Sequence, residues 1–194
     1  MKKRIVKTLT LMIYFWGCIW YDKKYLKGVN FNRSCFSIGW KWILRYWFGQ
    51  KIIGYARDVP FPIPRGTTIV NPKNIIFDNN DMNNFHSNGC FYQATKGKIV
   101  IGSGTQIAPN CGLVTTNHDI YNIKKHAKGK NVIIGKDCWL GMNAILLPGV
   151  ELGDHTIVGA GSIVTKSFLD GNCVICGNPA KIIKYLDKEK INEI

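Results

Sequence analysis

The second half of the chain repeats an aliphatic residue at every sixth position. A period of six does not match the 3.6 residues per turn of an α-helix, but it suits short extended segments joined by tight corners. We therefore expect a solenoid of parallel strands in which three segments form one coil of about eighteen residues. The repeated positions are Ile101, Ile107, Leu113, Ile134, Leu140, Leu146, Leu152, Val158 and Val164.

Glycine follows the aliphatic residue in many of these hexads, at positions 102, 135, 141, 153 and 159. We expect these glycines to occupy corners where the backbone needs unusual dihedral angles. The stacked coils would then bury one continuous aliphatic column.

The repeat stops after His118 and resumes at Val132. Residues 119–131 contain no hexad, so we expect them to form an excursion loop outside the solenoid. Long excursions of this kind are frequently functional.

Three prolines, at positions 60, 62 and 64, indicate a boundary upstream of the solenoid. We expect residues 1–57 to form an N-terminal, mainly helical extension that is rich in aromatic residues. Residues 58–194 would form the hexapeptide-repeat domain. Within it, the tail from Lys181 to Ile194 is expected to be a short C-terminal helix that covers the open end.

The chain carries a formal net charge of +14. Such a surplus attracts anions, but no run of basic residues carries the signature of a nucleic-acid-binding module, so we expect no nucleic acid partner. The seven cysteines have no spacing typical of a disulfide framework or a zinc ribbon. They are expected to be free thiols in a reducing cytoplasm, and we expect no bound metal.

The N-terminal segment is basic from Met1 to Lys7 and uncharged from Thr8 to Tyr21. No small-residue cleavage site follows, and the apolar run is short for a membrane span. Two interpretations stay open. The segment is either a peripheral helix at the inner face of the membrane, with its aromatic residues at the boundary, or a helix that packs on the core. The aromatic residues concerned are Tyr14, Phe15, Trp16 and Trp20.

An ordered set of motifs resembles the hexapeptide-repeat O-acetyltransferases, most closely the galactoside and maltose acetyltransferases and their relatives in polysaccharide biosynthesis. The resemblance covers Phe85 to Lys184. It implies a left-handed parallel β-helix, acetyl-CoA as co-substrate, and a homotrimer with active sites between neighbouring subunits. The motifs are Ile107-Ala108-Pro109-Asn110, Asn117-His118-Asp119, Ile134-Gly135-Lys136-Asp137-Cys138-Trp139-Leu140-Gly141, Leu147-Pro148-Gly149-Val150, Val158-Gly159-Ala160-Gly161-Ser162 and Gly177-Asn178-Pro179-Ala180-Lys181.

His118 is the candidate catalytic residue. Acetyl transfer to a hydroxyl needs a base to remove the proton, and histidine titrates near neutral pH. His118 stands at the edge of the solenoid, where the excursion loop begins, and the catalytic histidine of the family falls on it. We expect Asp119 or Asn117 to orient its ring. His126 and His155 are expected to be solvated, and His86 to lie near the same edge.

The resemblance also implies a binding site for acetyl-CoA. Trp139 would lie beside the pantetheine arm, and cations at the nucleotide end would meet the phosphates. The acceptor residues of the galactoside enzymes have no clear counterpart here, so Asn84, Gln93 and Asn117 are the local candidates for contact with the sugar. The acetyl-CoA candidates are Trp139, Met142, Ala160, Thr165, Lys166, Lys181 and Lys184.

Several other functions remain open. Within the transferases, the acceptor is either a sugar hydroxyl, the amino group of an amino sugar, or serine. A carbonic anhydrase of the γ type shares this solenoid but needs closely placed histidines, and we expect His118 and His126 not to stack. A non-catalytic solenoid that serves as a scaffold is the last alternative.

Overall fold

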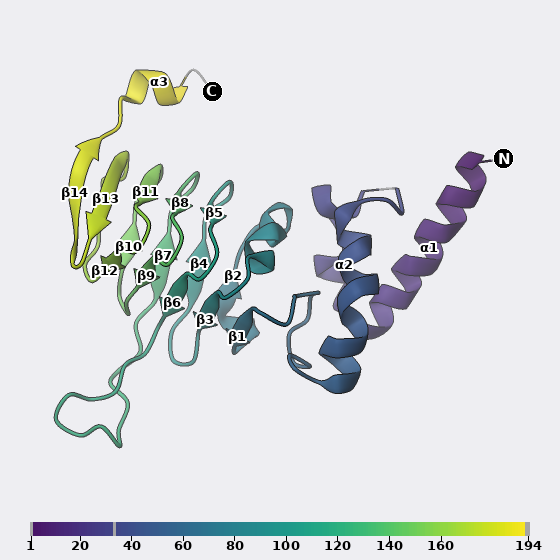
Figure 1. The fold of residues 1–194 in the computed structure, drawn as a ribbon, viewed down its shortest axis with the longest axis horizontal. Helices are drawn as coiled ribbons and strands as arrows, with labels where there is room; N and C mark the ends of the chain where they lie inside the picture. The colour runs from purple at the N-terminus through teal and green to yellow at the C-terminus, as the bar shows by residue number, and fades with distance from the viewer. Residues whose placement is uncertain (1, 33, 193–194) are drawn as a thin grey trace. The chain divides into compact units, whose positions relative to one another are not determined.

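The computed structural model describes residues 2–32 and 34–192. The chain forms two compact units, Met1–Thr67 and Thr68–Ile194, which are seen as ribbons in Figure 1.

The second unit winds into coils whose strands stack into three sheets (Figure 1). Sheet A contains, in spatial order, β1 (Thr68–Val70), β3 (Phe91–Gln93), β6 (Gly112–Val114), β9 (Ile145–Leu146) and β12 (Ile163–Val164). Sheet B contains β10 (Glu151–Leu152), β7 (Val132–Ile134), β4 (Ile99–Ile101) and β2 (Ile75–Ile76). Sheet C contains β14 (Ala180–Tyr185), β13 (Cys173–Gly177), β11 (Thr156–Val158), β8 (Trp139–Leu140) and β5 (Gln106–Ile107).

Successive strands visit sheets B, C and A in turn, so the three sheets form the sides of a triangular prism. The short helical turn η4 (Pro72–Asn74) lies between β1 and β2. A longer turn, η5 (Asn79–His86), takes the place of a sheet C strand between β2 and β3. Sequence periodicity therefore predicted the solenoid correctly.

The aliphatic positions of the hexads form the core of the prism. Ile134 pairs with Leu152 in sheet B, and the two are eighteen residues apart. Leu140 pairs with Val158 in the same way in sheet C. Each buried aliphatic side chain contributes about 1.5–3 kcal/mol relative to an exposed one. The predicted coil length and the predicted inward column are confirmed.

The glycines of the hexads play a different part from the one we expected. None of the five has a positive φ angle. A Cβ atom on Gly135 would lie 2.6 Å from the backbone nitrogen of Asp154 in the next coil, so a hydrogen is the largest substituent that fits. The left-handed residues stand two positions later, at Asp137 (φ 52°) and His155 (φ 54°). The glycines thus permit close stacking, and the prediction about corner dihedrals is wrong.

The C-terminal end of the solenoid is a β-hairpin. β13 and β14 pair antiparallel, with Cys176 opposite Lys181 and Val174 opposite Lys184. A short helix, α3 (Lys188–Asn192), follows. The expected helix from Lys181 is therefore a strand in its first half, because its backbone completes the edge of sheet C.

The first unit is mainly helical, as predicted. It contains α1 (Lys2–Trp20) and α2 (Ile38–Trp47), joined by the short turns η1 (Lys23–Tyr25) and η2 (Val29–Phe31), and then the π-helical segment η3 (Phe48–Ile53). Among the described residues, no helix combines the length and the apolar character that crossing a membrane requires.

A cluster of tryptophans holds α1 against α2. The ring centroids of Trp16 and Trp47 lie 5.0 Å apart, and those of Trp20 and Trp47 lie 5.6 Å apart. Gly17 permits the close approach, because a Cβ atom there would lie 2.8 Å from the side chain of Ile43. These contacts make one face of α1 part of the core of the first unit.

The proline-rich segment belongs to the first unit, although we expected it to begin the repeat domain. The buried amide of Gln50 donates to the carbonyl oxygen of Phe61 at 2.9 Å and accepts from the backbone nitrogen of Ile63 at 3.1 Å. The side chains of Val59, Phe61 and Ile63 are fully buried. These contacts extend the first unit to Thr67.

The chain has seven cysteines. All seven are free thiols: Cys90, Cys111, Cys138 and Cys173 are buried, and Cys18, Cys35 and Cys176 are half-buried.

Candidate functional site

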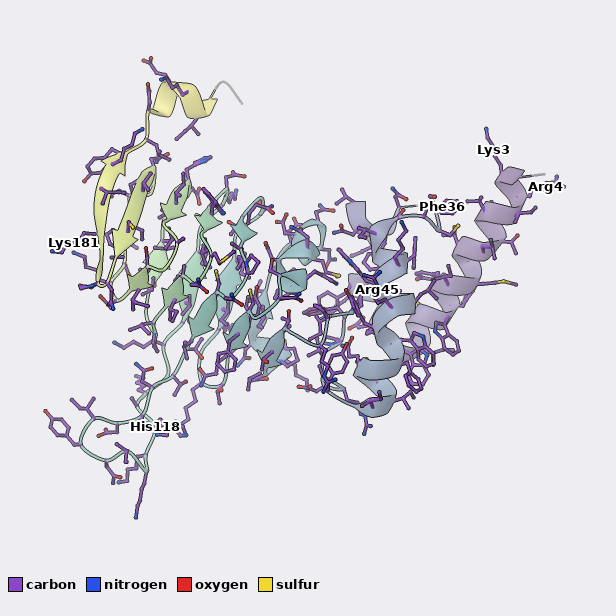
Figure 2. The ribbon with its side chains drawn as sticks, viewed as in Figure 1. Lys3, Arg4, Phe36, Arg45, His118 and Lys181 are labelled. Carbon is purple, nitrogen blue, oxygen red and sulfur yellow. The ribbon has the colours of Figure 1, made fainter. Side chains whose placement is uncertain are left out.

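The excursion loop leaves the prism at the corner between sheets A and B, between β6 and β7. Figure 2 shows His118 where the loop joins the solenoid. Backbone hydrogen bonds close the neck of the loop, from Lys130 to the carbonyl of Thr115 and from Ala127 to the carbonyl of Asn117, each at 2.9 Å. His118 is thus an exposed residue on a fixed backbone.

The ring of His118 is oriented by a carbonyl group. Its Nδ1 atom lies 2.7 Å from the carbonyl oxygen of Ile123, in the same loop. A carbonyl oxygen only accepts hydrogen bonds, so Nδ1 carries the proton. The Nε2 atom of the neutral ring is then an acceptor. An imidazole held in this tautomer is suited to remove a proton from a bound hydroxyl.

His126 lies against His118. Their ring centroids are 4.5 Å apart with an interplanar angle of 32°, and the two residues form an antiparallel bridge. Our expectation that these histidines do not stack is wrong, because the loop folds back on itself as a hairpin. Among the residues that the structure describes, no group of three or more His, Cys, Asp or Glu side chains is placed to hold a metal ion.

Asp119 does not orient His118. Its Oδ1 atom accepts hydrogen bonds from the backbone nitrogens of Tyr121 and Asn122, at 2.8 and 3.0 Å. The carboxylate therefore shapes the turn of the loop. The side chain of Asn117 is exposed next to His118. The expected role of Asp119 or Asn117 falls instead to the carbonyl group of Ile123.

Gln93 lies beside the neck of the loop. It ends β3, and its side-chain Oε1 atom accepts from the backbone nitrogen of Thr115 at 3.2 Å. Thr115 is three positions before His118. Asn117 is therefore next to His118 in the chain, and Gln93 contacts the backbone three residues before His118.

Asn84 lies elsewhere and is 1% exposed. Its amide donates to the carbonyl oxygen of Thr105 at 2.8 Å and accepts from the backbone nitrogen of Ile107 at 2.9 Å. These bonds hold η5 against β5 in sheet C. An amide engaged in this way argues against the expected contact with an acceptor.

His86 also lies on the sheet C side. Its Nδ1 atom is 3.1 Å from the carbonyl oxygen of Met82 within η5. Burial lowers the pKa of His86 to about 4, so the ring is neutral at physiological pH. The expectation that His86 lies near the same corner as His118 is wrong, because η5 replaces a strand of sheet C.

The outer face of sheet C carries a row of side chains that runs along the solenoid. Gln106, Trp139 and Ile157 are paired across neighbouring strands, then Val174 and Lys184. Trp139 is 54% exposed and Lys184 is also exposed. With strands about 4.8 Å apart, Lys184 lies about 14 Å along the axis from Trp139.

The other acetyl-CoA candidates occupy two corners. Met142 and Ala160 are exposed at the corner between sheets C and A, where the backbone nitrogen of Gly161 donates to the carbonyl of Met142 at 2.8 Å. Thr165 and Lys166 are exposed at the corner between sheets A and B.

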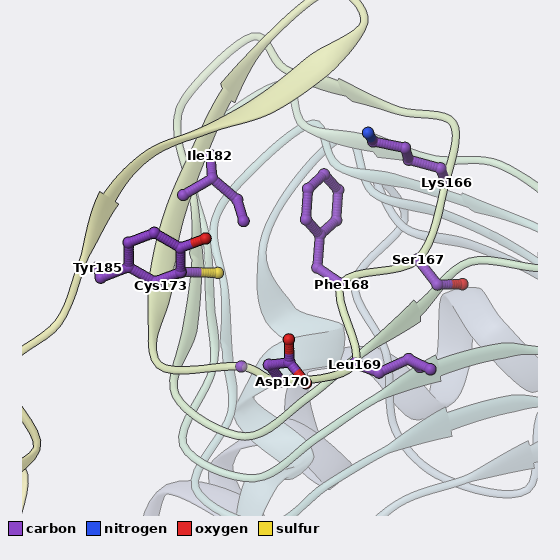
Figure 3. Close-up of a pocket in the computed structure, with 9 residues that line it drawn as sticks. Lys166, Ser167, Phe168, Leu169, Asp170, Cys173, Ile182 and Tyr185 are labelled. Atoms are coloured by element: carbon purple, nitrogen blue, oxygen red, sulfur yellow. The ribbon is translucent and has the colours of Figure 1, made fainter.

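A cavity of about 400 Å³ lies at the C-terminal end of the solenoid. Figure 3 shows Lys166 and Phe168 facing the hairpin residues Ile182 and Tyr185 across it. Asp170 lines the same cavity. Lys166 is the lining residue that the sequence predicted as a site residue, and the others were missed because the hairpin that brings Tyr185 opposite Phe168 was not predicted.

His118 with its neighbours, and Trp139, thus form two groups on different sides of one chain, whereas Thr165 and Lys166 share the corner of His118. His118, Asn117 and the neighbouring Gln93 lie at the corner between sheets A and B. Trp139 lies on sheet C, the side of the prism opposite that corner. The packed aliphatic column lies between the two groups.

Known proteins share the repeat and the fold described above. Residues 131–166 match the family model "Bacterial transferase hexapeptide (six repeats)". The chain carries hexapeptide repeats over this range. Its solenoid is a left-handed parallel β-helix, as the resemblance implied. An N-acyltransferase from Bacillus cereus, AntD, shares the fold with a TM-score of 0.52 at 18% identity, over 68% of this chain and 84% of that one.

Two sequence relatives are acetyltransferases by name. The chain is 33% identical over 111 residues to the galactoside O-acetyltransferase of Escherichia coli (strain K12), which is 55% of this chain and 54% of the relative. It is 40% identical over 90 residues to the putative colanic acid biosynthesis acetyltransferase WcaF of the same strain, which is 46% of this chain and 49% of the relative. The chain therefore matches about half the length of each of these relatives.

Proposed function

We propose that this hexapeptide-repeat protein transfers an acetyl group from acetyl-CoA to a sugar hydroxyl in cell-surface polysaccharide biosynthesis, with His118 as the general base. The observation that carries the proposal is the 2.7 Å contact between Nδ1 of His118 and the carbonyl oxygen of Ile123. It leaves Nε2, the other ring nitrogen of an exposed histidine, as a proton acceptor.

The reaction requires one proton acceptor and one leaving group. The sugar oxygen attacks the thioester carbon while Nε2 of His118 takes the hydroxyl proton. The carbon–sulfur bond then breaks, and the departing CoA sulfur takes the proton from the imidazolium. The hydrogen bond to Ile123 is kept throughout, because Nδ1 donates in both the neutral and the charged ring.

The binding site for acetyl-CoA is proposed along sheet C, at its corner with sheet A, and at the cavity at the C-terminal end of the solenoid. Trp139 offers an exposed aromatic surface to the pantetheine arm. Lys184 and Lys181 on β14, together with Lys166, supply positive charge for the phosphates. The apolar walls of the cavity at Phe168 and Tyr185 suit a flat heteroaromatic base, and the remaining candidates, Met142, Ala160 and Thr165, would contact the same ligand mainly through backbone groups.

The placement of these groups supports a homotrimer. In the proposed complex, the thioester of acetyl-CoA reaches His118 and its pantetheine arm passes Trp139. The two residues cannot belong to the same chain, because the prism lies between them. A second copy that presents sheet C to the corner at His118 brings the two together. A closed ring of three such heterologous contacts is a trimer.

The acceptor site is proposed at the corner between sheets A and B. Gln93 and Asn117 present polar side chains close to His118, which suits hydrogen bonding to a sugar. Relatives named for galactoside and for colanic acid favour a carbohydrate acceptor. An amino sugar and serine are alternative acceptors.

The experiment that tests the proposal is an acetyl-CoA turnover assay against a panel of acceptors. The panel contains simple sugars, nucleotide sugars, polysaccharide fragments, an amino sugar and serine, each with wild-type protein and with His118→Ala. Turnover that depends on a sugar and on His118 supports the proposal. Turnover only with an amine or serine identifies the alternative transferase, and absence of acetyl-CoA binding favours a scaffold.

The stacked pair of histidines makes it necessary to measure the zinc content of the protein as well. Because His118 and His126 lie 4.5 Å apart, the spacing argument against a zinc site no longer holds. Stoichiometric zinc in the purified protein, together with hydration of carbon dioxide, would favour the carbonic anhydrase alternative.

A further inference from the structure

The outward face of α1 carries a continuous apolar stripe. Its residues recur at intervals of three and four, which places them on one side of the helix. Met12, Phe15 and Ile19 are 63%, 66% and 68% exposed, and they form the end of the stripe nearest the C-terminus of α1. The stripe consists of Ile5, Leu9, Met12, Phe15 and Ile19.

The opposite face of α1 is already used by the core of the first unit. Trp16 and Trp20 pack on Trp47, and Tyr14 packs on Trp40 at 6.1 Å between ring centroids. Packing on the core, one of the two interpretations left open by the sequence, therefore uses one face of α1 and leaves the other face exposed. Of the four aromatic residues expected at a membrane boundary, Phe15 alone is exposed to solvent, and the other three are half-buried.

Positive charge is concentrated in the same unit. Residues 1–67 contain thirteen Lys or Arg residues and two Asp residues, which accounts for +11 of the net charge of +14. Lys3, Arg4 and Lys7 are exposed at the beginning of α1. Figure 2 shows Lys3 and Arg4 at that end of the helix.

We propose that this face of α1 docks on an anionic lipid bilayer. An interfacial helix buries an apolar stripe at the boundary of the acyl chains while cations meet the headgroups, and α1 has both features. A nucleic acid would neutralise the charge but would leave the stripe exposed. A second copy would cover the stripe but would bring two strongly positive units together.

The docked helix lies parallel to the membrane surface. Only one face of α1 is apolar and outward, and the other is bound to α2, so the bilayer contacts α1 along its side. At 1.5 Å per residue the nineteen residues of α1 extend for about 28 Å. This contact does not depend on acetyl transfer, so its test is independent of the proposed enzymatic function.

The first experiment is co-sedimentation of the full-length protein with vesicles. The triple variant Met12→Glu, Phe15→Glu, Ile19→Glu changes only outward side chains of α1. Its matched control is Ile120→Glu, Tyr121→Glu, Ile123→Glu in the excursion loop, where the side chains are 83%, 93% and 75% exposed. We expect the wild type and the control to bind vesicles of phosphatidylcholine with phosphatidylglycerol, and the α1 variant to bind at least tenfold more weakly.

The second experiment tests the charge. Replacement of Lys3, Arg4 and Lys7 by Ala should abolish the preference for phosphatidylglycerol over pure phosphatidylcholine and flatten the dependence on salt. The matched control replaces Lys124, Lys125 and Lys128 of the loop by Ala, which removes the same number of charges. Equal loss of binding in both charge variants would indicate diffuse attraction and would overturn the proposal.

Two measurements keep the result interpretable. Thermal unfolding followed by circular dichroism shows whether the α1 variants are folded, and light scattering without lipid reports the number of subunits. A change in subunit number in the Met12, Phe15 and Ile19 variant would identify the stripe as a contact between copies and would contradict lipid docking. Wild-type protein that stays in the supernatant at low salt would contradict it as well.

Discussion

The imidazole rings of His118 and His126 stack at the neck of the excursion loop, 4.5 Å apart between centroids. The backbones of the two residues are bridged in antiparallel fashion. The proposed base is therefore held from two sides, by the carbonyl group of Ile123 through a hydrogen bond and by the ring of His126 through packing. A loop that holds the residue immediately before it in this way ties the position of the base to the closure of the loop.

Replacement of His118 by Ala should lower turnover by about two to four orders of magnitude, because the reaction loses its base. The fold should be unchanged, since the side chain is exposed. Steady-state kinetics with the identified acceptor measures the effect, and His155→Ala serves as a control at another corner of the solenoid. Near-normal turnover in His118→Ala would remove the proposed mechanism.

Replacement of His126 should separate packing from proton chemistry. We expect His126→Ala to lower kcat about tenfold with an unchanged KM for acetyl-CoA, because a loosened His118 ring is less well placed. His126→Phe keeps a flat ring and should retain most of the activity. If the Phe variant loses as much as the Ala variant, the imidazole of His126 acts chemically and does not only position its neighbour.

If the active site is shared between neighbouring subunits, combining two inactive variants in one trimer should restore activity. His118→Ala lacks the base, and Trp139→Glu places a negative charge where polyanionic acetyl-CoA is expected. Mixed trimers, co-expressed with two affinity tags and purified on both, contain one interface with an intact His118 and an intact Trp139. They should recover about one third of wild-type activity. No recovery in trimers of verified mixed composition would place the whole site within one chain.

The double variant Lys181→Ala, Lys184→Ala should raise the KM for acetyl-CoA about tenfold and leave the KM for the acceptor unchanged. Charge-assisted contacts to phosphate are worth about 1.5–3 kcal/mol when well formed and less when exposed, as these lysines are. Lys73→Ala, Lys96→Ala removes two exposed charges elsewhere on the solenoid. A rise in the acceptor KM instead would show that the wrong ligand has been assigned to β14.

The stability of the second unit should fall as the pH is lowered from 7 to 5. Burial lowers the pKa of His86 to about 4 from its ordinary value of 6.5, so the unfolded chain binds a proton in this range and the folded chain does not. The free energy of unfolding should decrease by about 2 kcal/mol from this residue. Denaturant unfolding of wild-type protein and His86→Gln at both pH values measures the difference. An equal decrease in the free energy of unfolding of the two proteins would show that His86 is not the residue responsible.

Much of the repeat domain could be predicted from the sequence because its information is local. An aliphatic residue at every sixth position, as at Ile134, Leu140 and Leu146, allows only a short extended segment per hexad. The break after His118 marked the excursion loop for the same reason. The choice of His118 as base also came from the chain itself, since this histidine ends a hexad and lies within the Asn-His-Asp motif that resembles the family.

The tertiary structure decided what depends on contacts between coils and between helices. It showed that Gly135 makes room for the backbone of the next coil, and that β14 is a strand because it completes the edge of sheet C. It assigned the orientation of His118 to the carbonyl of Ile123 and to His126, which no spacing could reveal, because the closure of a loop brings together residues that share no periodicity. Finally, it divided α1 into a buried and an exposed face, since only packing against α2 determines which side of an apolar helix is covered.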